Sequence, residues 1–190
     1  LGDVYKRQVE GNTVTFSDPE TRLDLGAVAK GYIADRMADY LRGRGVSSAI
    51  LDLGGNLYCL GTKPGGKPFQ VGVQYPYQDR SQVLGTLPVS DQSVVTSGVY
   101  ERRIQVEGRS YHHILDAATG WPVENGLVSV TILSPSSADG DALSTACFAL
   151  GLEEGMALAE SLEGVEALFV TEDLAVHPTS GMAALFTPAQ

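Results

Sequence analysis

Two oxygen-bearing side chains four residues apart, Asp141 and Thr145, have the spacing of half a metal site. On a helix, residues i and i+4 lie one turn apart on the same face. A carboxylate and a hydroxyl placed in this way suit a hard cation such as Mg²⁺, with water and substrate phosphates completing the octahedron. The alternative is structural: Asp139 caps the helix, Asp141 complements the helix dipole, and Thr145 bonds back to a carbonyl.

A second segment, Asp24–Gly31, is rich in small residues and precedes a predicted helix. Its glycines let the backbone approach a ligand closely, and the N-terminus of the helix offers unpaired N–H groups to an anion. Asp24 can accept hydrogen bonds from a ligand, while Lys30 can reach a phosphate or pair with an acid. The alternative is an ordinary strand-to-helix turn with Asp24 as the cap.

Two adjacent histidines, His112 and His113, lie in a predicted strand. Neighbouring residues of a strand point to opposite faces, so at most one of them faces a given site, and His113 shares its face with Leu115. A histidine can act as a general base near neutral pH, although a lone histidine is more often structural. Asp116–Gly120 favours a turn, and Leu53–Asn56 is either a ligand-facing glycine turn or a bend between strands.

The composition excludes several classes of protein. The chain has 190 residues, of which 43% are hydrophobic and 19% charged, as is typical of a globular chain with its own core. The formal net charge of −10 argues against nucleic acid and anionic membrane surfaces as partners, and a phosphate ligand would need a metal ion or a local positive field. Neither GxxxxGK[ST] nor GxGxxG occurs. Cys59 and Cys147 lack the spacing of a zinc or iron–sulfur site.

Hydrophobic periodicity predicts an α+β fold in which hairpins outnumber helices. We expect a helix that is stopped by Gly45 and whose apolar face carries Ile33, Met37 and Leu41, with Ala34 and Ala38 beside them. Further helices are predicted over 137–150, with its buried side at Leu143, Ala146, Cys147 and Leu150, and over 153–162. The predicted strands are 14–16, 49–53, 58–61, 69–73, 83–89, 94–96, 102–106, 110–115, 128–133, 167–171 and 175–177.

Five stretches in a fixed order carry a resemblance to a known family. They are Asp24–Tyr32, Leu53–Asn56, Thr96–Arg102, His113–Pro122 and Asp141–Ala146. Together they resemble the ApbE family of FAD:protein FMN transferases, once described as thiamine-biosynthesis lipoproteins. The resemblance implies an ApbE-like, T-fold-related α+β architecture of mostly antiparallel sheets with a few packing helices.

The activity that the resemblance implies is a Mg²⁺-dependent cleavage of the pyrophosphate of FAD. FMN would move to a Thr or Ser hydroxyl of an acceptor flavoprotein, and AMP would be released. The resemblance also implies that Asp24 and Lys30 contact FAD and that Leu115 lies against it.

The metal ligands and the base are implied in the same way. The backbone carbonyl of Ala27 and the side chains of Asp141 and Thr145 would hold the Mg²⁺ ion, with Ser144 adjacent. Asp141 would be catalytic through that ion, and His113 would deprotonate the acceptor hydroxyl. These groups meet only if the segment at Ala27 folds against the helix predicted over 137–150.

Members of the family are longer than this chain, so we expect residues 1–190 to form part of an ApbE-like domain whose N-terminal part is missing. The resemblance further implies a lipoprotein of the cell envelope, on the outer face of the inner membrane, held by a lipid anchor outside this chain. Ala117 stands where the family usually has Pro, and the turn should survive because Pro there mainly adds rigidity. Two other activities fit the same residues: Mg²⁺-dependent hydrolysis of FAD to FMN and AMP, or FAD binding without turnover.

Overall fold

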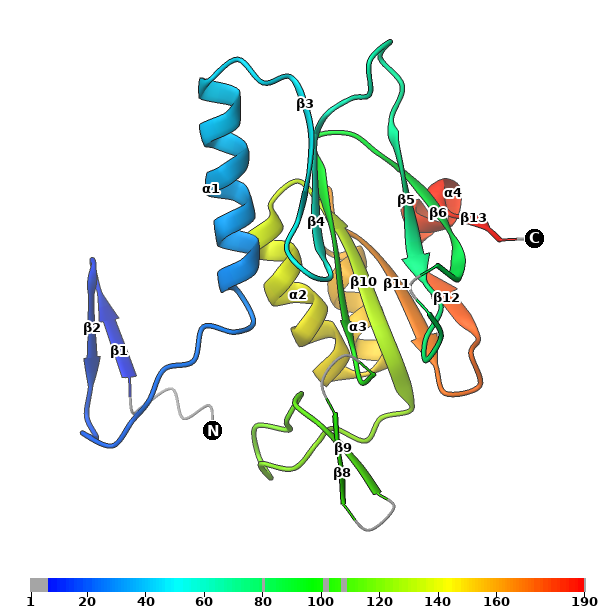
Figure 1. Cartoon of the computed structure of the whole chain (residues 1–190). Coiled ribbons are helices and arrows are strands. Elements are labelled where there is room, and N and C mark those ends of the chain that lie inside the picture. The colour runs from blue at the N-terminus through cyan, green and yellow to red at the C-terminus, as the bar shows by residue number, and fades with distance from the viewer. Residues whose placement is uncertain (1–6, 80, 101–102, 107–108, 190) are drawn as a thin grey trace.

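A computed structural model describes residues 7–79, 81–100, 103–106 and 109–189 (Figure 1). Its centre is a six-stranded antiparallel sheet in the order β12-β11-β10-β7-β4-β3. These strands are β3 (Ser48–Asp52), β4 (Asn56–Gly61), β7 (Gln92–Gly98), β10 (Leu127–Ser134), β11 (Glu166–Thr171) and β12 (Val176–Pro178).

The remaining elements surround this sheet. A three-stranded sheet has the order β13-β6-β5, and two further pairs are the hairpins β1-β2 and β8-β9. The bounds of these strands are β1 (Arg7–Glu10), β2 (Thr13–Phe16), β5 (Phe69–Gln74), β6 (Val83–Val89), β8 (Arg103–Val106), β9 (Arg109–His112) and β13 (Thr187–Pro188). The helices are α1 (Ala29–Gly43), α2 (Ser137–Leu150), α3 (Leu152–Glu160) and α4 (Ser180–Leu185). The predicted α+β class is confirmed, and none of the described helices is long and apolar enough to cross a membrane.

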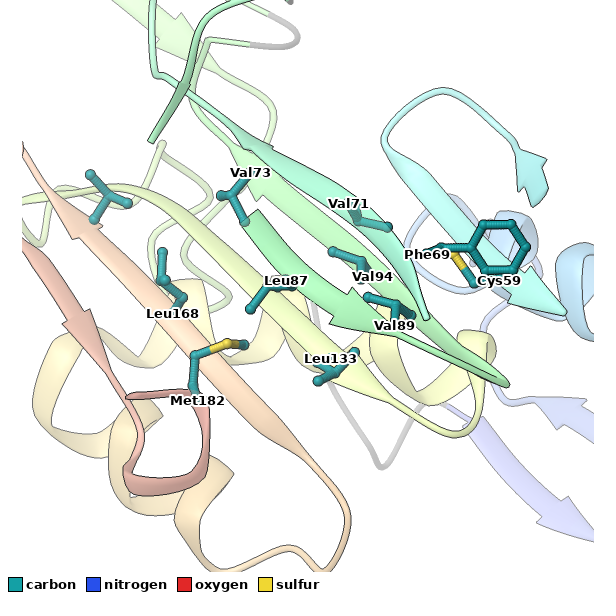
Figure 2. Close-up of a cluster of buried hydrophobic side chains, with 11 residues drawn as sticks. Cys59, Phe69, Val71, Val73, Leu87, Val89, Val94, Leu133, Leu168 and Met182 are labelled. Atoms are coloured by element: carbon teal, nitrogen blue, oxygen red, sulfur yellow. The ribbon is translucent and has the colours of Figure 1, made fainter. Parts of the chain in front are cut away.

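The central sheet is covered on both faces, which is why every residue of β10 is buried. Val130 and Ile132 belong to a cluster with residues of α2 and α3, whereas Leu133 points to the opposite side. On that side the β5-β6 hairpin lies over the sheet, and Figure 2 shows Val71 and Leu87 among the side chains that fill the space between them. The result is three layers: helices, the six-stranded sheet and the smaller sheet.

Helix α1 packs mainly small residues against the rest of the protein, so the predicted apolar face is confirmed for Ala34, Ala38 and Leu41 and wrong for Ile33 and Met37. Gly31, Ala34 and Ala38 are buried, whereas Ile33 and Met37 are 47% and 43% exposed. Small side chains let the helix axis come close to β4 and to α2, and the larger residues are turned outward. The predicted end of the helix is confirmed, because Arg44 is the C-cap and Gly45 follows with a positive φ of 82°.

Helix α2 has the predicted bounds but a more polar buried face than predicted. Gly140 and Ser144 face inward together with Cys147 and Phe148, while Leu150 is exposed. The start follows from the Ser136 side chain, which accepts a hydrogen bond from the Asp139 N–H as an N-cap. An added Cβ at Gly140 would lie 2.8 Å from the hydroxyl oxygen of Ser134, so glycine brings the first turn close to the sheet.

The strand predicted over 110–115 is wrong in its second half. β9 ends at His112, and beyond it only an isolated bridge joins Leu115 to Pro122. The chain leaves the strand because the Asp116 side chain accepts hydrogen bonds from the following backbone and closes a tight turn. The sequence pattern also missed β1, α4 and β13, which are short elements with little periodicity.

Candidate active site

The beginning of α1 lies directly against the beginning of α2 (Figure 1). Gly31 makes this possible, since an added Cβ there would overlap the Ser137 carbonyl oxygen and lie 2.7 Å from the Cα of Ala138. Two residues that are 106 positions apart are therefore in backbone contact. The two segments meet at Gly31, inside α1, whereas Ala27 lies four residues earlier in an exposed turn, so the predicted contact of Ala27 with helix 137–150 stays a prediction.

Asp141 occupies the junction between the two helices and is 4% exposed. Its Oδ2 accepts a hydrogen bond of 3.0 Å from the Gly31 N–H, in the first turn of α1. Its Oδ1 lies 3.9 Å from Nζ of Lys30, whose side chain is 37% exposed. Burial of a carboxylate is costly unless it is paired, and here a backbone N–H and an ammonium group provide the pairing.

Two hydroxyl groups lie one turn further along α2, beside a third from β7. Ser144 and Thr145 share hydrogen bonds with Ser97 of β7, at 2.8 and 3.3 Å. Ser144 also donates to the carbonyl oxygen of Asp141 at 3.0 Å, and Thr145 reaches the same oxygen at 3.5 Å. The structural role considered for Thr145, a bond back to a carbonyl, is thus present but long. Ser97 was not predicted as a site residue, although it lies within one of the five motif stretches.

The donor set fits a hard cation. No group of three or more His, Cys, Asp or Glu side chains among the described residues could hold a metal ion. What the junction offers is one buried carboxylate and neighbouring hydroxyl oxygens, which suits Mg²⁺ with ligands completed by water and phosphate rather than a soft transition metal. Asp141 Oδ1, which points toward Lys30 beyond hydrogen-bond distance, is the oxygen that could take a cation.

The first turn of α2 receives a carboxylate from the other helix in addition to its N-cap Ser136, and Asp139 is not the cap that the structural alternative supposed. Asp35 Oδ1 accepts from the Ser137 N–H at 2.8 Å, and Asp35 Oδ2 accepts from the Ala138 N–H at 2.9 Å. Each helix therefore supplies a carboxylate to the first turn of the other. Sequence reasoning missed Asp35; its only local signal is a position one turn after Gly31 on the same helix.

Asp24 is not the cap of α1. Its Oδ1 accepts a hydrogen bond of 2.7 Å from the Gly26 N–H, which forms a local turn. The N-cap of α1 is Val28, which makes no side-chain capping bond. Since Asp24 is exposed, it remains accessible to a ligand that approaches the beginning of the helix.

His113 and Leu115 lie in the loop that follows β9, and the predicted alternation of faces is found. Ile114 is buried in the α2–α3 core cluster, while Leu115 is 40% exposed and His113 is exposed. His112 points inward: its Nε2 donates to the Val123 carbonyl oxygen at 3.1 Å. His113 is exposed, and the half-buried His112 lines the hollow beside this loop.

Asp116 closes this loop. Its Oδ1 accepts from the backbone N–H groups of Ala118 and Thr119, both at 2.8 Å, and from the Thr119 hydroxyl. These hydrogen bonds, led by that of the Thr119 N–H, lower the pKa of Asp116 from its ordinary value. The turn forms with Ala117 in place of proline, as predicted.

A broad hollow opens beside the same loop. Its wall includes the aromatic residues Tyr77, Tyr111 and Trp121 together with the charged residues Arg103 and Glu124. Asp141 is not part of this wall, so the hollow and the helix junction are separate features.

Comparisons with known proteins agree on one family. A family model described as the ApbE family matches residues 3–169. Among curated relatives, the FAD:protein FMN transferase of Klebsiella pneumoniae is 43% identical over 176 residues, covering 93% of this chain and 54% of the relative. That of Treponema pallidum is 41% identical over 179 residues, covering 90% of this chain and 49% of the relative.

Solved structures give the same result. The ApbE protein of Thermotoga maritima superimposes with a TM-score of 0.86 and 31% identity, covering 96% of this chain and 60% of that one. The flavin transferase ApbE of Vibrio cholerae gives a TM-score of 0.82 at 31% identity, with 96% and 58% covered. The chain spans about half the length of the curated relatives it matches. From the family model and these relatives together, the chain belongs to the ApbE family.

Proposed function

We propose that the protein transfers FMN from FAD to a Thr or Ser hydroxyl of an acceptor flavoprotein and releases AMP. The observation that carries the proposal is the buried Asp141 carboxylate, held against the first turn of α1 and beside Lys30. A helix N-terminus, an ammonium group and an available carboxylate oxygen together suit a pyrophosphate with its cation. The names of the relatives support the same activity.

The proposed reaction forms one bond and breaks one. The acceptor hydroxyl oxygen bonds to the phosphorus of the FMN moiety, the bond from that phosphorus to the bridging oxygen breaks, and AMP leaves with this oxygen. The hydroxyl proton passes to a base, for which we propose His113 because it is exposed beside Leu115. A hydroxyl is a weak nucleophile until its proton is removed, so such a base accelerates the attack.

Further residues have proposed roles around the pyrophosphate. Lys30 binds the phosphates beside the first turn of α1, and Asp24 and Leu115 contact the rest of FAD. Asp141, Thr145 and the Ala27 carbonyl would hold Mg²⁺, with Ser144 beside them. Bound there, the ion would neutralise negative charge that grows during phosphoryl transfer.

The test is incubation of the protein with FAD, Mg²⁺ and an acceptor flavoprotein, followed by measurement of covalent flavin and AMP. Asp141→Asn keeps an acceptor for the Gly31 N–H but removes the charge, so we expect transfer to fall by at least about a hundredfold. Asp139→Asn removes an equal charge in the same turn from an exposed residue and should retain transfer. Equal rates for the two variants would refute the role of Asp141.

Product analysis separates the alternatives. Covalent flavin on the acceptor with one AMP per flavin supports the transferase. Free FMN and AMP in the absence of acceptor would instead indicate hydrolysis of FAD, and unchanged FAD would indicate binding alone. From the family resemblance we also propose that the protein acts at the cell envelope, as a lipoprotein.

A further inference from the structure

We propose that Asp35 is a positioning residue for Asp141, and that it tunes the affinity of the cation site by fixing the register of α1 against α2. The inference rests on the proposed function, because it concerns the same site. Asp35 itself is part of neither the predicted ligand set nor the predicted FAD contacts. Its role follows from the hydrogen bonds at the helix junction.

The first step of the argument is the double hydrogen bond of Asp35. Both carboxylate oxygens are used, one by the Ser137 N–H and the other by the Ala138 N–H. Oδ2 also lies 3.3 Å from the hydroxyl of Ser136, the N-cap of α2. A carboxylate that accepts hydrogen bonds from two successive backbone N–H groups fixes both the position and the rotation of the helix end.

The second step is the reciprocal bond. Asp141 lies one turn after Ser137 on α2, and it accepts the N–H of Gly31, which lies one turn before Asp35 on α1. The two carboxylates therefore form a closed arrangement, in which each helix caps the other. With direct backbone contact at Gly31, a small displacement of either helix end must change the position of the Asp141 oxygens.

The third step concerns where an anion can bind. The leading N–H groups of α2 are taken by Asp35, and that of Asp139 by Ser136. The N-cap of α1 provides no such side chain. The first turn of α1 is also occupied, because the Gly31 N–H donates to Asp141 and the Ala29 N–H donates to the Leu25 carbonyl oxygen. The ammonium group of Lys30 is therefore the positive charge that remains beside Asp141 for an anion.

The experiment measures FAD binding by fluorescence anisotropy over a series of Mg²⁺ concentrations, without acceptor. Asp35→Asn replaces one accepting oxygen with a donor that opposes the Ala138 N–H. We expect the Mg²⁺ concentration at half-maximal binding to rise by about ten- to a hundredfold, as for other groups that orient metal ligands. Asp139→Asn makes the same change of charge at an exposed position in the first turn of α2, and its Mg²⁺ midpoint should stay within about twofold of the parent. Both variants should still bind FAD at saturating Mg²⁺.

The outcomes distinguish the inference from the proposed function. No Mg²⁺ dependence in the parent would contradict the proposed function. If FAD binding by the parent depends on Mg²⁺ but the Mg²⁺ concentration at half-maximal binding is no higher in Asp35→Asn than in Asp139→Asn, the positioning role is overturned. If Asp35→Asn fails to fold by circular dichroism, Asp35→Glu keeps the charge and both acceptors but moves them by one methylene. A folded Asp35→Glu with the parental midpoint would overturn the inference equally.

Discussion

The helix junction and the His113 loop are held in opposite ways. At the junction, Asp141 is almost completely buried and is bonded to a residue 110 positions away. In the loop, the Asp116 side chain accepts hydrogen bonds from residues two and three positions further on, and its backbone bonds to Gly120 and Trp121. The junction is fixed by the tertiary fold, whereas the loop owes its shape to local hydrogen bonds and a single buried anchor, Ile114.

This difference corresponds to two chemical demands. A cation and a pyrophosphate require oxygen ligands in a constant arrangement, which buried helix ends supply. A base that must meet the hydroxyl of a second protein has to be reachable from solvent, and His113 is exposed. We infer that the protein keeps its proposed phosphate site rigid and its proposed acceptor side accessible.

The largest effect should come from the anchor of the loop. Ile114→Ala removes a side chain that is 4% exposed and packed in the α2–α3 cluster, so the free energy of unfolding should fall by about 2–5 kcal/mol. Leu115→Ala, at the next and exposed position, should change it by less than about 0.5 kcal/mol. Urea unfolding of both variants measures this contrast, and similar losses would show that the loop is not anchored on one face.

A smaller loss of stability is expected at the junction. Gly31→Ala places a methyl group against the backbone of Ser137 and Ala138, which should lower the free energy of unfolding by about 3 kcal/mol. Gly43→Ala in the same helix has nothing within 4 Å of the new methyl group and should raise stability by up to about 1 kcal/mol. Urea unfolding again gives the values. A neutral Gly31→Ala would mean that the two helices can separate without cost.

The smallest and most local effect concerns pH. The lowered pKa of Asp116 means that its carboxylate stabilises the folded loop at pH values above the ordinary carboxyl range, and that this stabilisation is lost as the pH falls through the lowered value. Trp121 is the single tryptophan and lies in the same loop, so its fluorescence reports this change. The emission should be constant from pH 7 to about 4 and change below.

Two variants sharpen this measurement. Asp116→Ala should already show the altered emission at pH 7 and should lack the acidic transition. Glu124→Gln, an exposed acid of the following segment, should keep the parental profile. A transition that persists in Asp116→Ala would assign it to another group.

Local signals predicted much of the structure. The bounds of α2 follow from the serines before it and the glycine after it, and the end of α1 from Arg44 and Gly45. The alternation that exposes His113 and buries Ile114 follows from strand geometry, even though β9 ends earlier. The contact of the Ala27 segment with α2 is implied only by the family resemblance and stays a prediction.

Long-range packing explains what could not be predicted. Hydrophobicity placed Ile33 and Met37 on the buried face of α1 beside Ala34 and Ala38, but the close approach of α2 at Gly31 leaves these two larger side chains exposed. Asp35 and Ser97 form hydrogen bonds with residues that are 47 to 103 positions away in the sequence. A local sequence pattern does not predict such partners. The proposed roles of Asp24, Lys30 and His113 remain predictions.

The exchange of caps between α1 and α2 also has a consequence for synthesis on the ribosome. The bond from Ser137 to Asp35 closes a loop of 102 residues, and such distant contacts form late in folding. Helix α1 leaves the ribosome long before its partner is translated, with the carboxylate of Asp35 still in water. The junction at which we propose that the pyrophosphate binds therefore cannot form until α2 has been translated.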